Sequence, residues 1–170
     1  KKIAPEAALI GWNTSRIKLK EQKPLEALSV ARDTSNRFPD DVEGMGVLGA
    51  CLRVNEEIVE SLDVLNRAIE LNPNYAEALI SRGLIRLSQK SNTEALTDLE
   101  RAHKLKPHIK QTWDLIVRLK MEAQEYSNLI VLLNNMIEIE PKNENRLATL
   151  ALCYHHLKDF EPAIEAYNQA

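Results

Sequence analysis

The chain has 170 residues, of which 44% are hydrophobic and 28% are charged, and its net charge is −3 at pH 7. This composition is sufficient for a buried core, whereas the slightly acidic balance argues against nucleic acid as a ligand, because that requires a basic face. No apolar run approaches the roughly 18–20 residues that a membrane-spanning helix needs, and the N-terminus lacks a signal-peptide core. We therefore expect a soluble, cytoplasmic protein that does not insert into membranes.

Proline recurs along the chain every 34 residues, at Pro5, Pro39, Pro73, Pro107 and Pro141. Each of these prolines follows a helix-like stretch, which it ends because proline disfavours helix in the preceding residue and lacks an N–H group. A fixed period of 20–50 residues indicates stacked structural repeats. In chain order, the period divides a single array into residues 1–7 as the tail of a preceding repeat, repeats 8–41, 42–75, 76–109 and 110–143, and an incomplete repeat 144–170. The two ends suggest that the chain is a fragment of a longer protein.

Each repeat contains two helical patterns. In repeat 42–75, the first pattern places apolar or small residues at i, i+3, i+4 and i+7, namely Met45, Leu48, Gly49 and Leu52. The second pattern does the same from Ile58 to Ile69. Such spacing gives one helical face, and the small residues allow the paired helices to approach closely. Helices of about 14 residues are only marginally stable alone, so each pair must pack on its neighbours.

The phased residues resemble the tetratricopeptide repeat, and the resemblance extends over essentially the whole chain. Repeats 42–75 and 76–109 match the family pattern best, at Met45, Leu48, Gly49, Leu52, Ala68 and Pro73, and at Leu79, Gly83, Ala95, Leu99, Ala102 and Pro107. The third full repeat deviates at Arg82 and Arg86, which occupy positions that are usually apolar. The resemblance implies an all-α fold, a right-handed superhelix made of antiparallel helix pairs.

In this family the first helix of each repeat lines a concave groove, so the resemblance also indicates where a ligand would bind. The hypothesis is a partner-binding set of Trp12, Arg16, Leu19, Arg53, Ile80, Leu84 and Leu87. Tryptophan and arginine are frequent hot-spot residues in interfaces. Two alternatives stay open. Trp12 and Leu9 would instead pack on an earlier repeat, and a small helix rotation would bury Ile80 and Leu84 while turning Arg82 and Arg86 outward.

The residues that could carry chemistry favour structural roles. His155 and His156 are adjacent, and neighbouring residues on a helix point about 100° apart, so we predict no metal site there. Cys51 and Cys153 lie three repeats apart and are predicted to be buried thiols rather than a disulfide. Because no nucleophile with a nearby base and no phosphate-binding loop can be identified, we predict that the chain is not an enzyme and needs no cofactor.

The predicted function is a protein–protein interaction scaffold that binds a peptide or helical segment of a partner protein in the groove. One alternative is the substrate-recognition arm of a larger glycosyl- or sulfotransferase-type enzyme whose catalytic domain lies outside this chain. The other is a structural scaffold that forms homo-oligomers through exposed array ends.

Overall fold

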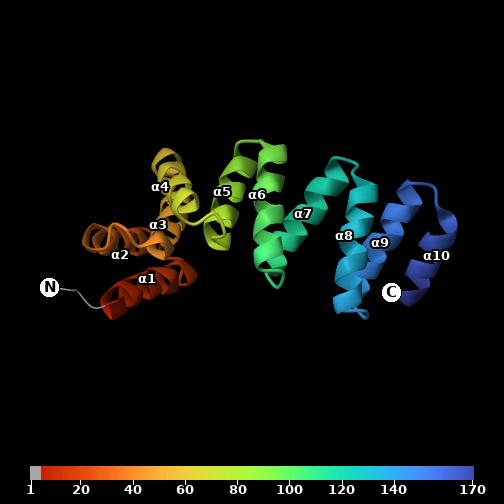
Figure 1. Cartoon of the computed structure of the whole chain (residues 1–170), viewed down its shortest axis with the longest axis horizontal. Helices are drawn as coiled ribbons and strands as arrows, with labels where there is room; N and C mark the ends of the chain where they lie inside the picture. The colour runs from red at the N-terminus through yellow and green to blue at the C-terminus, as the bar shows by residue number, and fades with distance from the viewer. Residues whose placement is uncertain (1–4) are drawn as a thin grey trace. The chain divides into compact units, whose positions relative to one another are not determined.

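The computed structural model describes residues 5–170, which form ten α-helices and no strand (Figure 1). The helices, in chain order, are α1 (Pro5–Lys20), α2 (Pro24–Arg37), α3 (Val42–Val54), α4 (Ile58–Leu71), α5 (Ala76–Ser88), α6 (Asn92–Leu105), α7 (Lys110–Glu122), α8 (Tyr126–Ile139), α9 (Glu144–His156) and α10 (Phe160–Gln169). The prediction of an all-α fold built from helix pairs is confirmed. Of the predicted tail of a preceding repeat, residues 1–4 lie outside the described residues, and residues 5–7 belong to the first turn of α1.

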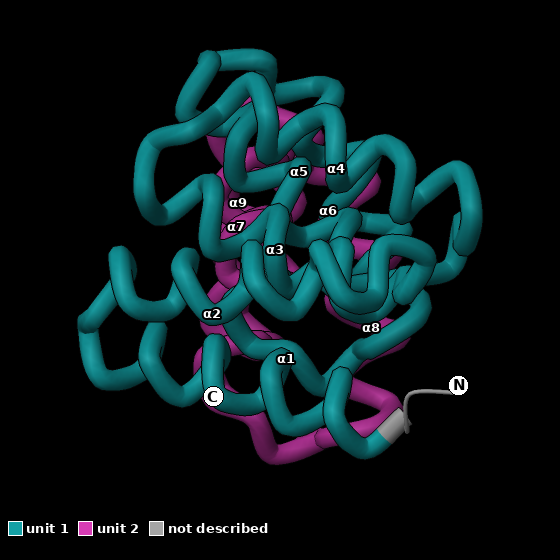
Figure 2. Tube along the Cα trace, turned by 90° about the vertical axis from the view of Figure 1, so that its left-hand side faces the viewer, with its two compact units in different colours: residues 1–113 teal, residues 114–170 magenta. Residues whose placement is uncertain are grey.

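The chain divides into two compact units, Lys1–Trp113 and Asp114–Ala170, which Figure 2 distinguishes in teal and magenta. We call them unit 1 and unit 2 and describe each by itself. The odd-numbered helices α3, α5, α7 and α9 begin 34 residues apart. The proline period therefore corresponds to the spacing at which helix pairs begin.

Unit 1 is held together by contacts between consecutive helices and between alternate ones. Each of α1, α3 and α5 packs against the helix that follows it, and α1 also contacts α3, as α3 contacts α5. One core cluster includes Trp12, Leu28 and Leu52, and a second includes Leu65 and Leu79. Every helix in this arrangement buries one face on its neighbours, which stabilises segments too short to persist alone.

Small residues set the closest approach within two helix pairs. A Cβ atom on Gly49 in α3 would lie 2.5 Å from Leu65 Cδ2 in α4, and one on Gly83 in α5 would lie 3.1 Å from Leu99 Cγ in α6. The hydroxyl of Ser61 donates a hydrogen bond to the Gly49 carbonyl over 2.7 Å. The side chain that glycine lacks is thus replaced by a leucine of the paired helix.

The turns inside the helix pairs share a backbone feature that the sequence did not reveal. A residue with positive φ stands in each turn, between 57° and 65°, at Gln22, Glu56, Lys90, Gln124 and Lys158. These residues are also 34 positions apart. The left-handed conformation is costly for residues other than glycine, by about 1–2 kcal/mol each. Their long polar side chains do not signal this geometry, so the turn type is visible only in the structure.

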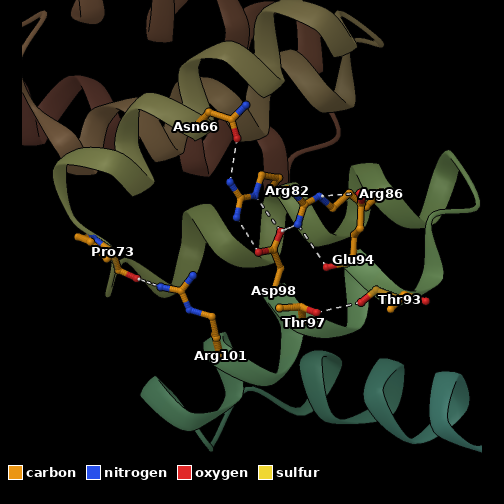
Figure 3. Close-up of polar contacts among 9 residues, drawn as sticks. All are labelled: Asn66, Pro73, Arg82, Arg86, Thr93, Glu94, Thr97, Asp98 and Arg101. Atoms are coloured by element: carbon orange, nitrogen blue, oxygen red, sulfur yellow. Dashed lines mark hydrogen bonds and ion pairs between the residues drawn. The ribbon is translucent and has the colours of Figure 1, made fainter.

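A buried ion-pair cluster ties α5 to α6 (Figure 3). Asp98 in α6 has a side chain that is only 2% exposed, and its carboxylate accepts hydrogen bonds from Arg82 and Arg86 in α5 at 2.7–2.8 Å. Arg82 also donates to Asn66 Oδ1 in α4 over 2.8 Å. The expectation that the two arginines turn outward is therefore wrong. They point inward because Asp98 supplies the counter-charge, and the alternative that invoked their rotation does not apply.

Unit 2 repeats the same packing on a smaller scale. The helix α9 contacts both α8 and α10. Leu133, Leu150 and Ala163 are buried from these three helices in turn. Arg146 at the start of α9 bonds the Met136 carbonyl over 3.1 Å and lies 2.9 Å from the Glu140 carboxylate, which joins α9 to the end of α8.

Candidate interaction surface

The first helices of the pairs in unit 1 present a common face. Because α1, α3 and α5 start in register and contact one another in sequence, residues 34 positions apart lie at matching heights. Two such rows define what we call the α1–α3–α5 face, Arg16, Ala50 and Leu84 in one row and Leu19, Arg53 and Leu87 in the other. All six residues are half-buried. The face is therefore mainly apolar, with two cations set into it.

Trp12 does not lie on this face. Its side chain is only 3% exposed, and its indole Nε1 donates a hydrogen bond to the Asp41 carboxylate over 2.7 Å. The ring occupies space next to Gly44 that a Cβ atom would fill. Trp12 thus fastens α1 to the start of α3 and offers a partner almost no area, so the proposal below does not use it. The alternative in which Trp12 packs on an earlier repeat does not apply either, since its partners belong to the repeat that follows.

The predicted apolar residues differ in how far they are covered. Ile80 is half-buried and packs against the core cluster around Leu65, and Leu19 packs against the cluster around Trp12. Leu84 and Leu87 are also half-buried. Each of the four retains some exposed surface, and Leu19, Leu84 and Leu87 lie within the rows just defined.

Tyr75 is a residue of this region that sequence reasoning missed. Its ring covers Gly46, and its hydroxyl donates a hydrogen bond to the Glu43 carbonyl over 2.9 Å. Burial raises the pKa of Tyr75 to about 12, the negative charge of Glu77 adds to this shift, and Arg16 opposes it. The available signal was a large residue placed just before α5 and a glycine one repeat earlier. Tyr75 therefore fills the α3 surface beside the two rows.

The two arginines of the face differ from most others in unit 1. Arg16 Nη1 donates to the Asn13 amide oxygen over 3.3 Å. Arg53 Nε is buried and has no hydrogen-bond partner among the described residues, and burial lowers the pKa of the Arg53 guanidinium. Arg32, by comparison, lies 2.6 Å from Glu57 and 2.7 Å from Glu60. The α1–α3–α5 face thus holds positive charge that the protein itself does not neutralise by direct pairing.

The histidines of unit 2 engage in aromatic contacts. His156 stacks on Tyr126 with ring centroids 4.6 Å apart, and His155 meets Phe160 edge-on at 5.8 Å. Within residues 5–170, no group of three or more His, Cys, Asp and Glu side chains is arranged to hold a metal ion. In the same part of the chain, no helix has the length and apolar character needed to cross a bilayer.

Both cysteines are free and buried, as the sequence predicts. Burial raises the pKa of each thiol to about 11. A raised thiol pKa stabilises the folded state below the unfolded value of about 8.5, and this contribution is lost as the pH rises toward the folded value.

We expect both thiols to react slowly with iodoacetamide at pH 8 in the native protein, because on the order of one thiol in a thousand is then ionised. Alkylation should accelerate when the pH is raised toward 11, and it should be fast at pH 8 in denaturant. Peptide mass spectrometry separates Cys51 in unit 1 from Cys153 in unit 2. Rapid native labelling of either residue at pH 8 would contradict the buried placement of that thiol.

Comparison with known proteins agrees with the helix-pair architecture. Paired helices recurring every 34 residues define a helical-repeat protein. Models of the tetratricopeptide repeat match residues 60–108 and 146–170. The chain is a tetratricopeptide repeat protein, which confirms the resemblance.

Relatives and solved structures are similar over nearly the whole chain. Anaphase-promoting complex subunit 3 of Schizosaccharomyces pombe is 21% identical over 94% of this chain, which spans only 24% of that relative. A chain of the Naa15/Naa10 structure bound to HypK-THB superposes with a TM-score of 0.82 at 18% identity, covering 94% of this chain and 24% of that one. MamA from Desulfovibrio magneticus RS-1 has a TM-score of 0.70 at 20% identity, covering 95% and 92%. At these identities the structural likeness establishes the fold.

Proposed function

We propose that the chain is a non-catalytic interaction scaffold whose α1–α3–α5 face binds a segment of a partner protein. The observation that carries this proposal is the pair of half-buried rows on three successive helices, which combine leucines with arginines. A peptide or amphipathic helix anchors on such a surface by apolar side chains, and polar contacts set its register. Arg16, Leu19, Arg53, Leu84 and Leu87 form the proposed contact, and Ile80 lies beside it.

The comparisons support the general class. The name of the fission yeast relative places it in a complex, and the Naa15/Naa10 structure is bound to HypK-THB. Both statements concern those proteins. Together with the family assignment, they make association with another protein the function that best fits this fold.

Replacing Leu87 by aspartate should weaken binding of a partner peptide at least about tenfold, because a charge then stands in the apolar row of the face. The peptide is first selected from a random phage-displayed library on the whole chain, and its affinity is then measured by fluorescence anisotropy. Val59→Asp is the matched control, since Val59 on α4 is 85% exposed and lies off the face. Loss of binding in the control, with Leu87→Asp unaffected, would place the contact elsewhere.

Self-association is a second candidate, favoured by a different observation. Ile17 in α1 is 54% exposed, whereas the residues at the same repeat position in α3 and α5, Cys51 and Ile85, are fully buried against the preceding helix pair. In unit 2, Tyr167 on α10 is 48% exposed, although its counterpart Leu133 on α8 is buried. These faces would be covered if α10 of one copy packed on α1 of another.

Such pairing predicts that light scattering detects masses above that of one chain, and that these masses decrease on dilution. Ile17→Glu should shift the equilibrium to the single chain, since it places a charge in the contact. Val131→Glu on α8, where the side chain is 63% exposed, should leave the equilibrium unchanged. A wild-type protein that has the single-chain mass at every concentration would rule this candidate out.

A further inference from the structure

We infer that the segment bound on the α1–α3–α5 face carries a carboxylate side chain that pairs with Arg53, assisted by Arg16, and that apolar residues flank this acid. The inference rests on the proposed function and specifies the chemistry of the partner. It depends on which arginines the protein neutralises by itself and which it does not.

Unit 1 has eight arginines among its described residues, and five of them lie within 4.0 Å of a carboxylate. Those five are Arg32, Arg37, Arg67, Arg82 and Arg86. A sixth, Arg101, donates to the Pro73 carbonyl over 2.8 Å. The remaining two are Arg16 and Arg53, and these are the arginines of the α1–α3–α5 face. Pairing with internal acids is thus the rule in unit 1, and the exceptions coincide with the proposed binding surface.

Arg53 is the stronger of the two sites. Its Nε atom is buried without a hydrogen-bond partner among the described residues, and burial lowers its pKa. A partly desolvated guanidinium without a counter-charge is unfavourable, and the fork of Nε and Nη donors matches the two oxygens of a carboxylate. A carboxylate from the partner would neutralise this charge in a region where water screens it weakly.

Arg16 contributes from the neighbouring helix. Its guanidinium is half-buried and lies close enough to Tyr75 to oppose the rise in the tyrosine pKa. The single hydrogen bond from Arg16 Nη1 to Asn13 leaves other donors of the group available to an acid. We therefore expect Arg16 to favour an acidic segment over a neutral one, with a smaller effect than Arg53.

The neighbours of Arg53 define what surrounds the acid. Leu19 and Leu87 occupy the same repeat position on the helices on either side. Adjacent helices pack about 8–10 Å apart, and an extended chain advances about 3.3 Å per residue. A segment that crosses the three helices would thus place an apolar residue about three positions before its acid and another about three positions after it.

The test is a selection of random 12-residue phage-displayed peptides on the full chain, followed by affinity measurements on the enriched sequences. We expect the enriched peptides to contain aspartate or glutamate with apolar residues about three positions away. Replacing that acid by its amide should weaken binding at least about tenfold, as expected for removing one member of a desolvated charge pair. Arg53→Gln should cause a similar loss, and the amide peptide should then bind the variant and the wild type equally well.

The matched control is Arg67→Gln, which removes the same charge from α4, where Arg67 is 60% exposed and paired with Asp40. Circular dichroism verifies that each variant is folded. If peptides bind, and Leu87→Asp weakens them, but they lack acids or bind Arg53→Gln unchanged, the inference is wrong and the proposed function stands. If no peptide is enriched, or if enriched peptides are insensitive to both Leu87→Asp and Arg53→Gln, the inference and the proposed function are both wrong.

Discussion

Replacing Asp98 by alanine is expected to lower the free energy of unfolding of unit 1 by about 3–5 kcal/mol, the typical cost of removing one partner from a buried ion pair. The carboxylate is almost fully buried and bonds two arginines whose side chains are only 14% and 24% exposed. In the variant, the guanidinium groups of Arg82 and Arg86 lose this counter-charge where water reaches them poorly. The link between α5 and α6 is lost at the same time.

Tryptophan fluorescence in a urea titration measures this effect in unit 1 alone, because both tryptophans, Trp12 and Trp113, belong to that unit. Asp40→Ala is the control. Asp40 pairs with Arg67 at the surface, where the two side chains are 89% and 60% exposed, and exposed ion pairs contribute little. A midpoint for Asp98→Ala that coincides with the control would mean that the buried cluster does not stabilise the unit.

Replacing Gly49 by leucine is expected to destabilise unit 1 by about 2 kcal/mol or more. A Cβ atom alone would lie 2.5 Å from Leu65, which is fully buried and has no free space into which to retreat. Overpacking of this kind costs about 1–3 kcal/mol or more, and the gain in helix propensity on leaving glycine, about 1 kcal/mol, offsets only part of that cost.

Gly83→Ala provides the matched comparison. There the added Cβ atom would lie 3.1 Å from Leu99, so a small adjustment accommodates it, and the propensity gain should leave stability nearly unchanged. Gly83→Leu should again be destabilising. Equal unfolding midpoints for Gly49→Leu and the wild type would show that α3 and α4 are not in the register described here.

The helix pairs could be predicted because their cause is local and repeated. Proline ends one helix at a fixed interval, the apolar spacing marks each buried face, and small residues such as Gly49 and Gly83 mark the close contacts. These signals are readable in any one repeat, and five copies of the period reinforce them. The starts of α3, α5, α7 and α9 follow directly from that pattern.

The side-chain placements that failed depend on residues far away in the sequence. Trp12 looks like an exposed anchor until Gly44, one repeat later, leaves room for its ring. Arg82 and Arg86 look misplaced at apolar positions until Asp98 of the paired helix supplies their counter-charge. In both cases a residue whose type is unusual for its position is matched by a second unusual residue, and only the structure shows that the two meet.

The half-buried rows of the candidate site were partly predictable. Periodicity assigns Arg16, Leu19, Arg53, Leu84 and Leu87 to one side of the first helices, and the structure finds all five half-buried. Periodicity could not predict that Arg16 and Arg53 lack internal acids, because ion pairing depends on side chains contributed by other helices. That property distinguishes these two arginines from most of the others in unit 1.

The most direct test of this account is a nuclear magnetic resonance titration of the isotopically labelled chain with a peptide selected on it. We expect the largest shift changes at the methyl groups of Leu19, Leu84 and Leu87 and at the Arg53 Nε–H, with Val59 on α4 and Leu25 on α2 unaffected. Shift changes confined to α2, α4 and α6 would contradict the central claim that the first helices of the pairs form the binding surface.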